Sequence, residues 1–309
     1  MTATSEPTAP SRFSDDLALA VDLAHEAGRL LMDRYERVEQ IDYKGARDVV
    51  TEVDRLSEEL IIAGIHARHP GDAILGEESG DVAQPGRAEA DEAIEAKEGS
   101  KRSVVDRGHG RIWVIDPLDG TVNYANGIPI FCVSLALVVD GTPVAGVVFD
   151  PTRGETFAAT RDSPATLDGR PVAASEKEKL ADYVVSMAVG GRGAWSRVRA
   201  VRKRIRVSRS MGSAALALAY VANGRFDAFI QSGGLSAWDI AAAGLIAERA
   251  GATVTDVVGG PWFDIGRPHR AAGVLAAPPA HHGTLLSLIR EAPATPGPAR
   301  APRASGADG

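Results

Sequence analysis

Acidic residues beside apolar segments are the groups in this sequence that could do chemistry. They are Asp116 and Asp119, which follow "IWVI" in "WVIDPLDGTVNY", Glu77, which follows "DAILG", and Asp54 and Asp239 beside other apolar runs. In open α/β folds, ligands collect at the carboxyl ends of strands. Carboxylates that meet there repel one another unless a cation or a proton lies between them. A set of carboxylates without histidine or thiolate suits a hard cation such as Mg²⁺.

Each of these acids also has a simpler structural interpretation. Aspartate, proline and glycine are favoured in turns, so "DPLDG" is compatible with a plain turn. Asp239 stands in the first turn of an expected helix, where an acid favours the helix dipole. Thr51 and Asp54 have the spacing of a capping box, and Glu77 is compatible with plain surface charge. Spacing alone therefore leaves both interpretations open.

Two segments that begin with glycine could bind an anion. Gly120-Thr121 follows the acidic turn, and Gly212-Ser213 precedes an expected helix at 213–223. If a helical turn begins at either place, its free backbone amides form an anion site. Metal ligands beside an anion pocket are typical of phosphate ester chemistry, in which metals activate water and stabilise the leaving oxygen.

The elements that must position these residues are helices and strands in alternation. Apolar periodicity predicts helices from Ser14 onward, over 52–68, over 195–203, over 213–223, in "SAWDIAAAGLIAERAG" and in "HHGTLLSLIR". Strands are expected in "DAILGEES", "RIWVID", "RFDAFIQ", "ATVTDV" and "AGVLAA", and three antiparallel strands in "IFCVSLALVVDGTPVAGVVFDPTRGETFAAT". This order predicts α and β elements layered on mixed sheets.

The boundaries of the folded unit follow from composition. We expect residues 13–291 to form a single compact domain, because no long linker interrupts them. Residues 80–110 are polar and alternately charged, which predicts an exposed insertion. Residues 1–12 and 292–309 are expected to be disordered tails.

Charge and cysteine content narrow the class of protein. The net charge of −7 gives no bulk attraction to nucleic acid or to a membrane surface. The single cysteine, Cys132, cannot form an internal disulfide, which fits a reducing compartment. The sequence shows no signal peptide and no apolar run long enough to span a membrane, so we expect a cytoplasmic protein.

Five segments of the chain form a recognisable series. They are "KGARDVVTEVD", "ILGEES", "WVIDPLDGTVNYANGIPIFCVSLAL", "SRSMGSAALALAYVANGRFDAFI" and "WDIAAAGLIAERAGATVTD". The third resembles the first signature of the inositol monophosphatase family, W-x-I-D-P-[IL]-D-G-T-x-N-[FY], and the fifth resembles the second signature. All five appear in the order that the family has. The resemblance covers about residues 14–290, without the segment 80–110.

The resemblance implies a fold and an activity. The family's fold is a layered αβαβα sandwich of the sugar-phosphatase type, in the α+β class. Its members are Mg²⁺-dependent phosphomonoesterases that are commonly homodimers, and lithium inhibits many of them. We therefore expect a hydrolase of small phosphorylated substrates, with inositol 1-phosphate as the default. Histidinol phosphate, fructose 1,6-bisphosphate and 3′-phosphoadenosine 5′-phosphate remain open as substrates.

The resemblance also implies metal ligands. Glu77 and Asp116, with the Leu118 carbonyl, resemble the ligands of a first Mg²⁺. Asp116, Asp119 and Asp239 resemble the ligands of a second Mg²⁺, so Asp116 would bridge the two ions. A third, more weakly held ion would be coordinated by Glu77 and by water molecules.

The resemblance further implies catalytic and phosphate-binding residues. Thr121 and Asp54 resemble the pair that positions and activates the attacking water, with Glu77 nearby. The amides of Gly120 and Thr121 would hold the phosphate. The capping interpretation of Asp54 is compatible with this role.

Substrate contacts are expected at Gly212, Ser213 and Ser232. Seven residues before Asp239, many inositol phosphatases have a glutamate that binds substrate hydroxyls, whereas this chain has Ser232 in "QSGGLSAWD". This departure weakens the assignment of inositol and leaves the metal chemistry unchanged. The insertion at 80–110 lies between the first two acidic segments, and both a lid and a plain exposed loop remain open for it.

A binding function is the competing hypothesis from another class. Some bacterial relatives in this family act with transcription machinery and RNA, and the basic stretch "WSRVRAVRKRIRVSRS" (195–210) is the feature that fits such a role. The same stretch is compatible with a solvated helix face and an edge strand. The intact acids favour a working enzyme, and we do not expect nucleic acid as its main partner.

Overall fold

The computed structural model describes residues 11–36, 41–45, 48–82, 110–191 and 193–290. Its helices are α1 (Ser14–Arg34), α2 (Glu52–Arg68), α4 (Thr121–Ala125), α5 (Ala194–Arg202), α6 (Ala214–Ala219), α7 (Ala237–Arg249) and α8 (Pro279–Arg290), with a short 3₁₀ turn at Leu180–Asp182. None of the helices in these ranges is both long and apolar enough to cross a membrane.

Most strands belong to one large sheet. Its strands, from edge to edge, are β10 (Arg170–Pro171), β9 (Thr166–Leu167), β8 (Glu155–Thr160), β7 (Thr142–Asp150), β6 (Cys132–Val139), β5 (Arg111–Asp119), β3 (Ala73–Gly76) and β4 (Gly80–Val82). Neighbouring strands are antiparallel except for β3 and β5, which run parallel. The carboxyl ends of β3 and β5 therefore lie side by side, which brings the two acidic segments together.

A second, smaller sheet contains both parallel and antiparallel pairs of strands. Its order is β12 (Val207–Arg209), β11 (Val184–Ala188), β13 (Ala228–Leu235), β15 (Ala272–Ala277) and β14 (Thr253–Asp256). The strand β11 runs parallel to both of its neighbours, whereas β15 is antiparallel to both of its own. A separate hairpin pairs β1 (Ile41–Gly45) with β2 (Asp48–Thr51).

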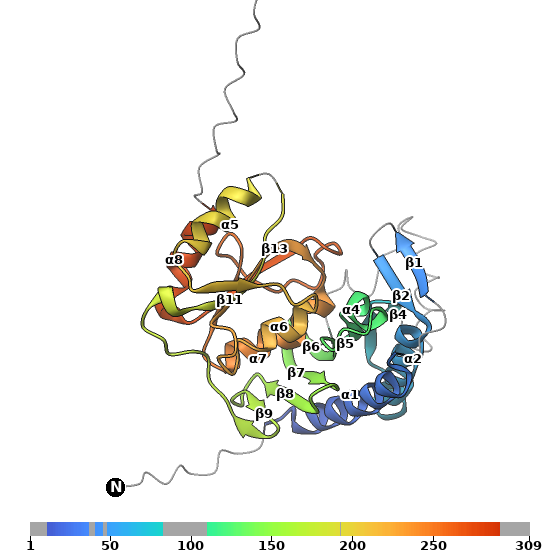
Figure 1. The fold of residues 1–309 in the computed structure, drawn as a ribbon. Helices are drawn as coiled ribbons and strands as arrows, with labels where there is room; N and C mark the ends of the chain where they lie inside the picture. The colour runs from blue at the N-terminus through green and yellow to red at the C-terminus, as the bar shows by residue number, and fades with distance from the viewer. Residues whose placement is uncertain (1–10, 37–40, 46–47, 83–109, 192, 291–309) are drawn as a thin grey trace, which may run out of the picture.

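The elements stack in five layers, which Figure 1 shows from the blue helices to the red one. Helices α1 and α2 cover one face of the large sheet, and α6 and α7 lie between the two sheets. Helices α5 and α8 cover the outer face of the small sheet. This arrangement is the αβαβα sandwich that the resemblance of the sequence motifs implies.

The alanine-rich middle layer explains how the two sheets approach each other. A β-carbon added at Gly146 on β7 would lie 2.9 Å from the Cα of Ala242 on α7, so the helix rests directly on the strand. Small side chains at Ala241 and Ala243 are fully buried on the same helix. Interiors are close-packed, so a larger residue at this contact would push the layers apart.

Two predicted elements have different boundaries in the structure. The helix predicted over 213–223 is α6, which ends at Ala219, and the chain continues in turns with hydrogen bonds between residues three apart. The turn at Gly224, which has a positive φ of 71°, follows directly. The strand predicted over 225–231 is β13, which begins at Ala228 and continues to Leu235. Residues 83–109 of the predicted insertion, and the tails 1–10 and 291–309, lie outside the described residues.

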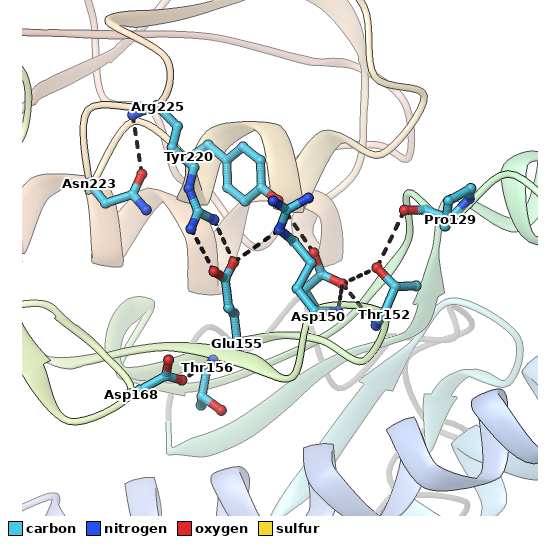
Figure 2. A network of polar contacts seen from close by, with 10 residues as sticks. Pro129, Asp150, Thr152, Glu155, Thr156, Asp168, Tyr220, Asn223 and Arg225 are labelled. Atoms are coloured by element: carbon cyan, nitrogen blue, oxygen red, sulfur yellow. Dashed lines mark hydrogen bonds and ion pairs between the residues drawn. The ribbon is translucent and has the colours of Figure 1, made fainter.

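A buried polar contact joins the middle layer to the large sheet. Asp150, at the end of β7, accepts hydrogen bonds from Thr152 Oγ1 at 2.7 Å and from the Tyr220 hydroxyl at 3.3 Å (Figure 2). Nearby, Arg225 Nη2 donates to Glu155 at 2.6 Å. These contacts fix the segment after α6 against the hairpin of β7 and β8, and so help to hold α6 in place.

Candidate active site

The acidic turn lies at a bulge in β5. Asp116 pairs with Ser134 and Asp119 with Cys132, so β5 has one more residue between these pairs than β6 has. Side chains alternate along a regular strand, and residues three apart would point to opposite faces. The extra residue at the bulge brings both aspartates to the same side. Pro117 has no amide hydrogen to donate to a neighbouring strand, so it fits a bulge, where the regular hydrogen bonds of the strand are interrupted.

Three carboxylates meet beside this bulge. Asp116, Asp119 and Asp239 each offer an oxygen atom, and these atoms all lie within 4.8 Å of one another. Asp116 and Asp119 are buried, and Asp239 is partly buried in the first turn of α7. Asp239 on α7 thus meets two residues of β5 that precede it by 123 and 120 positions, which is the grouping that the family resemblance implies.

The electrostatics of this cluster call for a cation. Burial, followed by the charges of Glu77, Asp119 and Asp239, holds the pKa of Asp116 well above its usual range. Burial and the charge of Asp119 raise the pKa of Asp239 to about 7. The donors are hard carboxylate oxygens that are costly to keep charged in the absence of a positive ion. This donor set fits Mg²⁺.

Glu77 reaches the same cluster from the neighbouring strand. Its carboxyl group shares a hydrogen bond with Asp116, and its backbone amide donates to the Ile115 carbonyl at 3.2 Å. The loop that presents it is held by Glu58, a buried residue of α2 that sequence reasoning missed. The Glu58 carboxylate accepts hydrogen bonds from the amides of Glu78 at 2.9 Å and Ser79 at 2.8 Å. Glu58 follows Asp54 by one helical turn, so the two side chains lie on the same face of α2, and this spacing could have indicated that Glu58 also faces the site.

Asp119 is held by the start of α6. Its Oδ2 accepts hydrogen bonds from Ser213 Oγ at 2.6 Å and from the Ala215 amide at 2.7 Å, and its Oδ1 accepts from the Ala214 amide at 3.1 Å. The anion at these free helical amides is therefore the protein's own carboxylate. These donors lower the pKa of Asp119, but burial outweighs them and the pKa is raised overall.

Gly212 has a steric reason to be glycine. Its φ is +79°, and an added β-carbon would lie 2.8 Å from Nδ2 of Asn123. That amide nitrogen donates to the carbonyls of Ile130 at 2.7 Å and Met211 at 2.8 Å. Asn123, which the sequence analysis did not single out, thus ties α4 to the segment that presents Ser213.

Thr121 and Asp54 lie in contact, as the family resemblance implies. Thr121 Oγ1 lies 3.0 Å from Asp54 Oδ1 and 3.0 Å from the Leu118 carbonyl oxygen. Asp54 is buried in the first turn of α2, so its carboxylate has little access to bulk water. Gly120, which precedes α4, has a φ of +102°, and a β-carbon there would lie 2.9 Å from the Ile130 carbonyl oxygen. Glycine alone allows this close approach.

A cavity of about 260 Å³ opens beside the acids. Asp119 and Asp239 form part of its wall, together with Gly212 and Ser213. Its other walls come from the carboxyl ends of β11 and β13, including Gln231. The Ser232 side chain is directed to another contact, because its Oγ accepts a hydrogen bond from the Gly190 amide at 2.9 Å.

Comparison with known proteins agrees with this geometry. A model of the inositol monophosphatase family matches residues 14–294. An inositol-1-monophosphatase of Mesorhizobium japonicum is 37% identical over 252 residues, which cover 79% of this chain and 86% of that protein. This chain belongs to the inositol monophosphatase family.

Other members of the inositol monophosphatase family have different names. The Nus factor SuhB of Pseudomonas aeruginosa is 36% identical over 269 residues, covering 83% of this chain and 90% of that protein. The crystal structure of the extragenic suppressor protein SuhB from Bartonella henselae superposes with a TM-score of 0.77 at 31% identity. That match covers 90% of this chain and 99% of the other. The layered fold is therefore that of the family.

Proposed function

We propose that this chain is a Mg²⁺-dependent phosphomonoester hydrolase that acts on a small polyol phosphate, with inositol 1-phosphate as the first substrate to test. The observation that carries the proposal is the meeting of Asp116, Asp119 and Asp239 within 4.8 Å of one another. Buried carboxylates this close need a counter-charge. A bound phosphate also needs one, and a shared divalent ion serves both.

The proposed metal ligands follow from the assembled residues. Glu77, Asp116 and the Leu118 carbonyl would hold one Mg²⁺, and Asp116, Asp119 and Asp239 would hold a second. A third, more weakly bound ion would be coordinated by Glu77. Bound Mg²⁺ supplies a lowered pKa for coordinated water and charge stabilisation for the phosphate and the leaving oxygen.

The chain's own residues position the attacking water. Thr121 Oγ1 lies 3.0 Å from Asp54 Oδ1 and 3.0 Å from the Leu118 carbonyl oxygen, so its single hydroxyl proton is donated to one of these two acceptors. The lone pairs of Oγ1 can therefore accept a hydrogen bond from a water. Buried Asp54 can in turn take a proton through Thr121, and the neighbouring Glu77 is a second acceptor. The backbone amides of Gly120 and Thr121 would hold the phosphate oxygens.

A panel of phosphate esters tests this proposal. Phosphate release would be measured with Mg²⁺ from inositol 1-phosphate, histidinol phosphate, fructose 1,6-bisphosphate and 3′-phosphoadenosine 5′-phosphate. We expect metal-dependent release, fastest from the polyol monophosphate. No release from any ester, with the protein folded and Mg²⁺ bound, would contradict the proposal.

Three further properties of the enzyme are part of the same proposal. We infer that it works in the cytoplasm, that it is a homodimer, and that lithium inhibits it. Sedimentation at enzyme concentrations used for assays tests the dimer, and lithium titration of phosphate release tests the inhibition. A monomer in sedimentation would contradict the inferred homodimer, and full activity in lithium would contradict the inferred inhibition. Neither result would contradict the proposed hydrolase activity.

A second candidate function is binding of single-stranded RNA on α5. Residues 193–210 carry seven arginines and lysines and no acid. Trp195 is 86% exposed and adjoins a groove lined by Val198, Arg199 and Arg202. An exposed aromatic ring among cations is a platform for stacked bases. The likeness to proteins named Nus factor SuhB also favours this function.

Tryptophan fluorescence tests the second function directly. The other three tryptophans, Trp113, Trp238 and Trp262, are buried, so Trp195 dominates any quenching by a ligand from solution. We expect salt-sensitive quenching by single-stranded RNA that is lost in Arg199→Glu. Unchanged fluorescence at low salt would exclude this platform.

A further inference from the structure

Two strands of the large sheet end in a buried aspartate at the same edge. The strand β5 ends at Asp119 and β7 ends at Asp150. Because β6 lies between them and is antiparallel to both, β5 and β7 run in the same direction. Neighbouring strands lie about 4.8 Å apart, so the two aspartates belong to strands that are about 10 Å apart.

Helix α6 spans this distance and is bound to an aspartate at each end. Its six residues give a length of about 9 Å. At its start, the Ser213 hydroxyl and two backbone amides donate to Asp119. Directly after its end, the Tyr220 hydroxyl donates to Asp150 Oδ2 at 3.3 Å (Figure 2). The helix is therefore held between a proposed metal ligand and a second carboxylate.

The contact between Tyr220 and Asp150 is held in place from both sides. Asp150 Oδ1 accepts hydrogen bonds from the Thr152 hydroxyl at 2.7 Å and from the Thr152 amide at 3.0 Å, which orients the carboxylate. The Arg225 guanidinium lies over the Tyr220 ring, with Cζ 4.8 Å from the ring centroid, and it also donates to Glu155 at 2.6 Å (Figure 2). A buried carboxylate is costly without hydrogen-bond partners, so loss of the Tyr220 hydroxyl would disturb this end of α6.

Between its two ends, α6 has little room to bend. Residues 215–219 are all buried. The Tyr220 amide donates to the Leu216 carbonyl at 3.0 Å, which continues the helical hydrogen bonds up to the tyrosine. Interiors are close-packed, so a short helix enclosed in this way moves as one body. A displacement at the Tyr220 end is therefore transmitted to the Ser213 end.

We propose that Tyr220 and Asp150 are positioning residues for Asp119. Their contact sets the place of α6 over the large sheet, and the start of α6 orients the Asp119 carboxylate toward a divalent ion. Neither residue belongs to the described lining of the cavity or to the cluster of three carboxylates, so their effect on the ion passes through α6. This inference rests on the metal site of the proposed function and extends it to the end of β7.

The substitution Tyr220→Phe removes the hydroxyl and keeps the ring. Calorimetry with Mg²⁺ on the folded protein should show about three- to tenfold weaker binding, which is less than direct partners of a metal ligand typically cause. The Mg²⁺ concentration for half-maximal phosphate release should rise by the same factor, while kcat at saturating Mg²⁺ stays within about twofold of the wild-type value. A merely structural role would lower Tm and leave the Mg²⁺ affinity unchanged.

Two further variants accompany this substitution. Tyr183→Phe is the matched control, because it removes another buried hydroxyl, in the apolar cluster between the small sheet and helices α5 and α8. It should leave the Mg²⁺ affinity unchanged. Asp150→Asn replaces one acceptor oxygen with an NH₂ group, so one of the donors around it loses its acceptor. It should weaken Mg²⁺ binding in the same way as Tyr220→Phe.

A double-mutant cycle tests the route through α6. If Tyr220 acts through the start of the helix, its loss matters less once Ser213 no longer holds Asp119. We therefore expect Tyr220→Phe to weaken Mg²⁺ binding by a smaller factor in the Ser213→Ala background than in the wild type. Independent, additive effects of the two substitutions on Mg²⁺ affinity would overturn the inference.

Binding and turnover separate this inference from the proposed function. If the wild type binds Mg²⁺ and releases no phosphate from any ester, the proposed hydrolase fails, and calorimetry still decides the role of Tyr220. Wild-type Mg²⁺ affinity in folded Tyr220→Phe would overturn the inference, whatever the phosphatase activity. Equal weakening of Mg²⁺ binding in Tyr183→Phe, or no Mg²⁺ binding by the wild type, would overturn it as well.

Discussion

Ser213 donates a hydrogen bond of 2.6 Å to the carboxylate of Asp119, across 94 residues of sequence. The bond joins the start of α6 to the end of β5. Two backbone amides at the start of α6, those of Ala214 and Ala215, also donate hydrogen bonds to the same carboxylate. Asp119 is therefore oriented before any ion arrives, and α6 in the middle layer is part of the proposed metal site.

Loss of this hydroxyl should weaken the metal site. In Ser213→Ala we expect the Mg²⁺ concentration for half-maximal activity to rise about tenfold or more, because groups that orient a metal ligand typically carry such an effect. Ser213→Thr keeps the hydroxyl and is the matched control. Equal Mg²⁺ dependence in Ser213→Ala and wild type would show that the α6 amides orient Asp119 without the hydroxyl.

Asp116→Asn should stabilise the metal-free protein. The substitution removes a buried carboxyl group whose charged form is disfavoured by burial and by the charges of Glu77, Asp119 and Asp239, which hold its pKa well above the usual range. We expect Tm in EDTA to rise by about 2–4 °C, which is the shift that 1 kcal/mol produces in a domain of this size. A lower Tm than that of the wild type in EDTA would contradict the view that these acids repel one another.

The metal-free protein should lose stability as pH rises through the range in which Asp239 titrates. Its pKa is raised from 3.8 to about 7 on folding. The folded state therefore holds a proton that the unfolded state has released. The contribution of this residue to the free energy of unfolding is greatest below about pH 4 and declines up to about pH 7.

The comparison with Asp239→Asn isolates this effect from other carboxyl groups. The difference in Tm between variant and wild type in EDTA should grow in favour of the variant from pH 4 to pH 7. Saturating Mg²⁺ should remove or reverse that difference at pH 7, because the ion binds the charged form. A difference that is flat with pH would refute the assigned shift.

Glu58→Gln should damage the site through the loop that carries Glu77. The Glu58 carboxylate accepts two backbone hydrogen bonds, and a carboxamide would turn an NH₂ group toward one of those amides. We expect a loss of about 1–3 kcal/mol in the free energy of unfolding, typical of a buried group without its partner. Denaturant unfolding measures this loss, with Glu59→Gln on the same helix as the control. Equal unfolding free energies for the two variants would contradict the structural role of Glu58.

The sequence was sufficient to predict elements with strong periodicity and the residues of the acidic turn. The alternation of apolar runs located β5 to β8, and the helical spacing located α1, α2 and α7. The approach of Asp54 to Thr121 and of Asp239 to Asp116 came from the family resemblance, because contacts this far apart in sequence have no local signal.

Irregular pairing was not visible in the sequence. Counting seven residues back from Asp239 leads to Ser232, whereas Gln231 is the residue that lines the cavity, because residues 232–234 bulge opposite Gly273 where β13 pairs with β15. The roles of Glu58 and Asn123 were also missed, since their partners are backbone groups of distant loops. Asn123 is the asparagine of the family signature, but a signature does not tell which backbone group a residue contacts.

The most direct test of the central claim is phosphate release from inositol 1-phosphate with Mg²⁺ and with EDTA, by the wild type and by Asp116→Asn. Asp116 stands at the centre of the cluster and would bridge the two ions. We predict release by the wild type that depends on Mg²⁺, and no metal-dependent release by the folded variant. Near-native activity in Asp116→Asn, or wild-type activity that persists in EDTA, would contradict the metal-dependent mechanism.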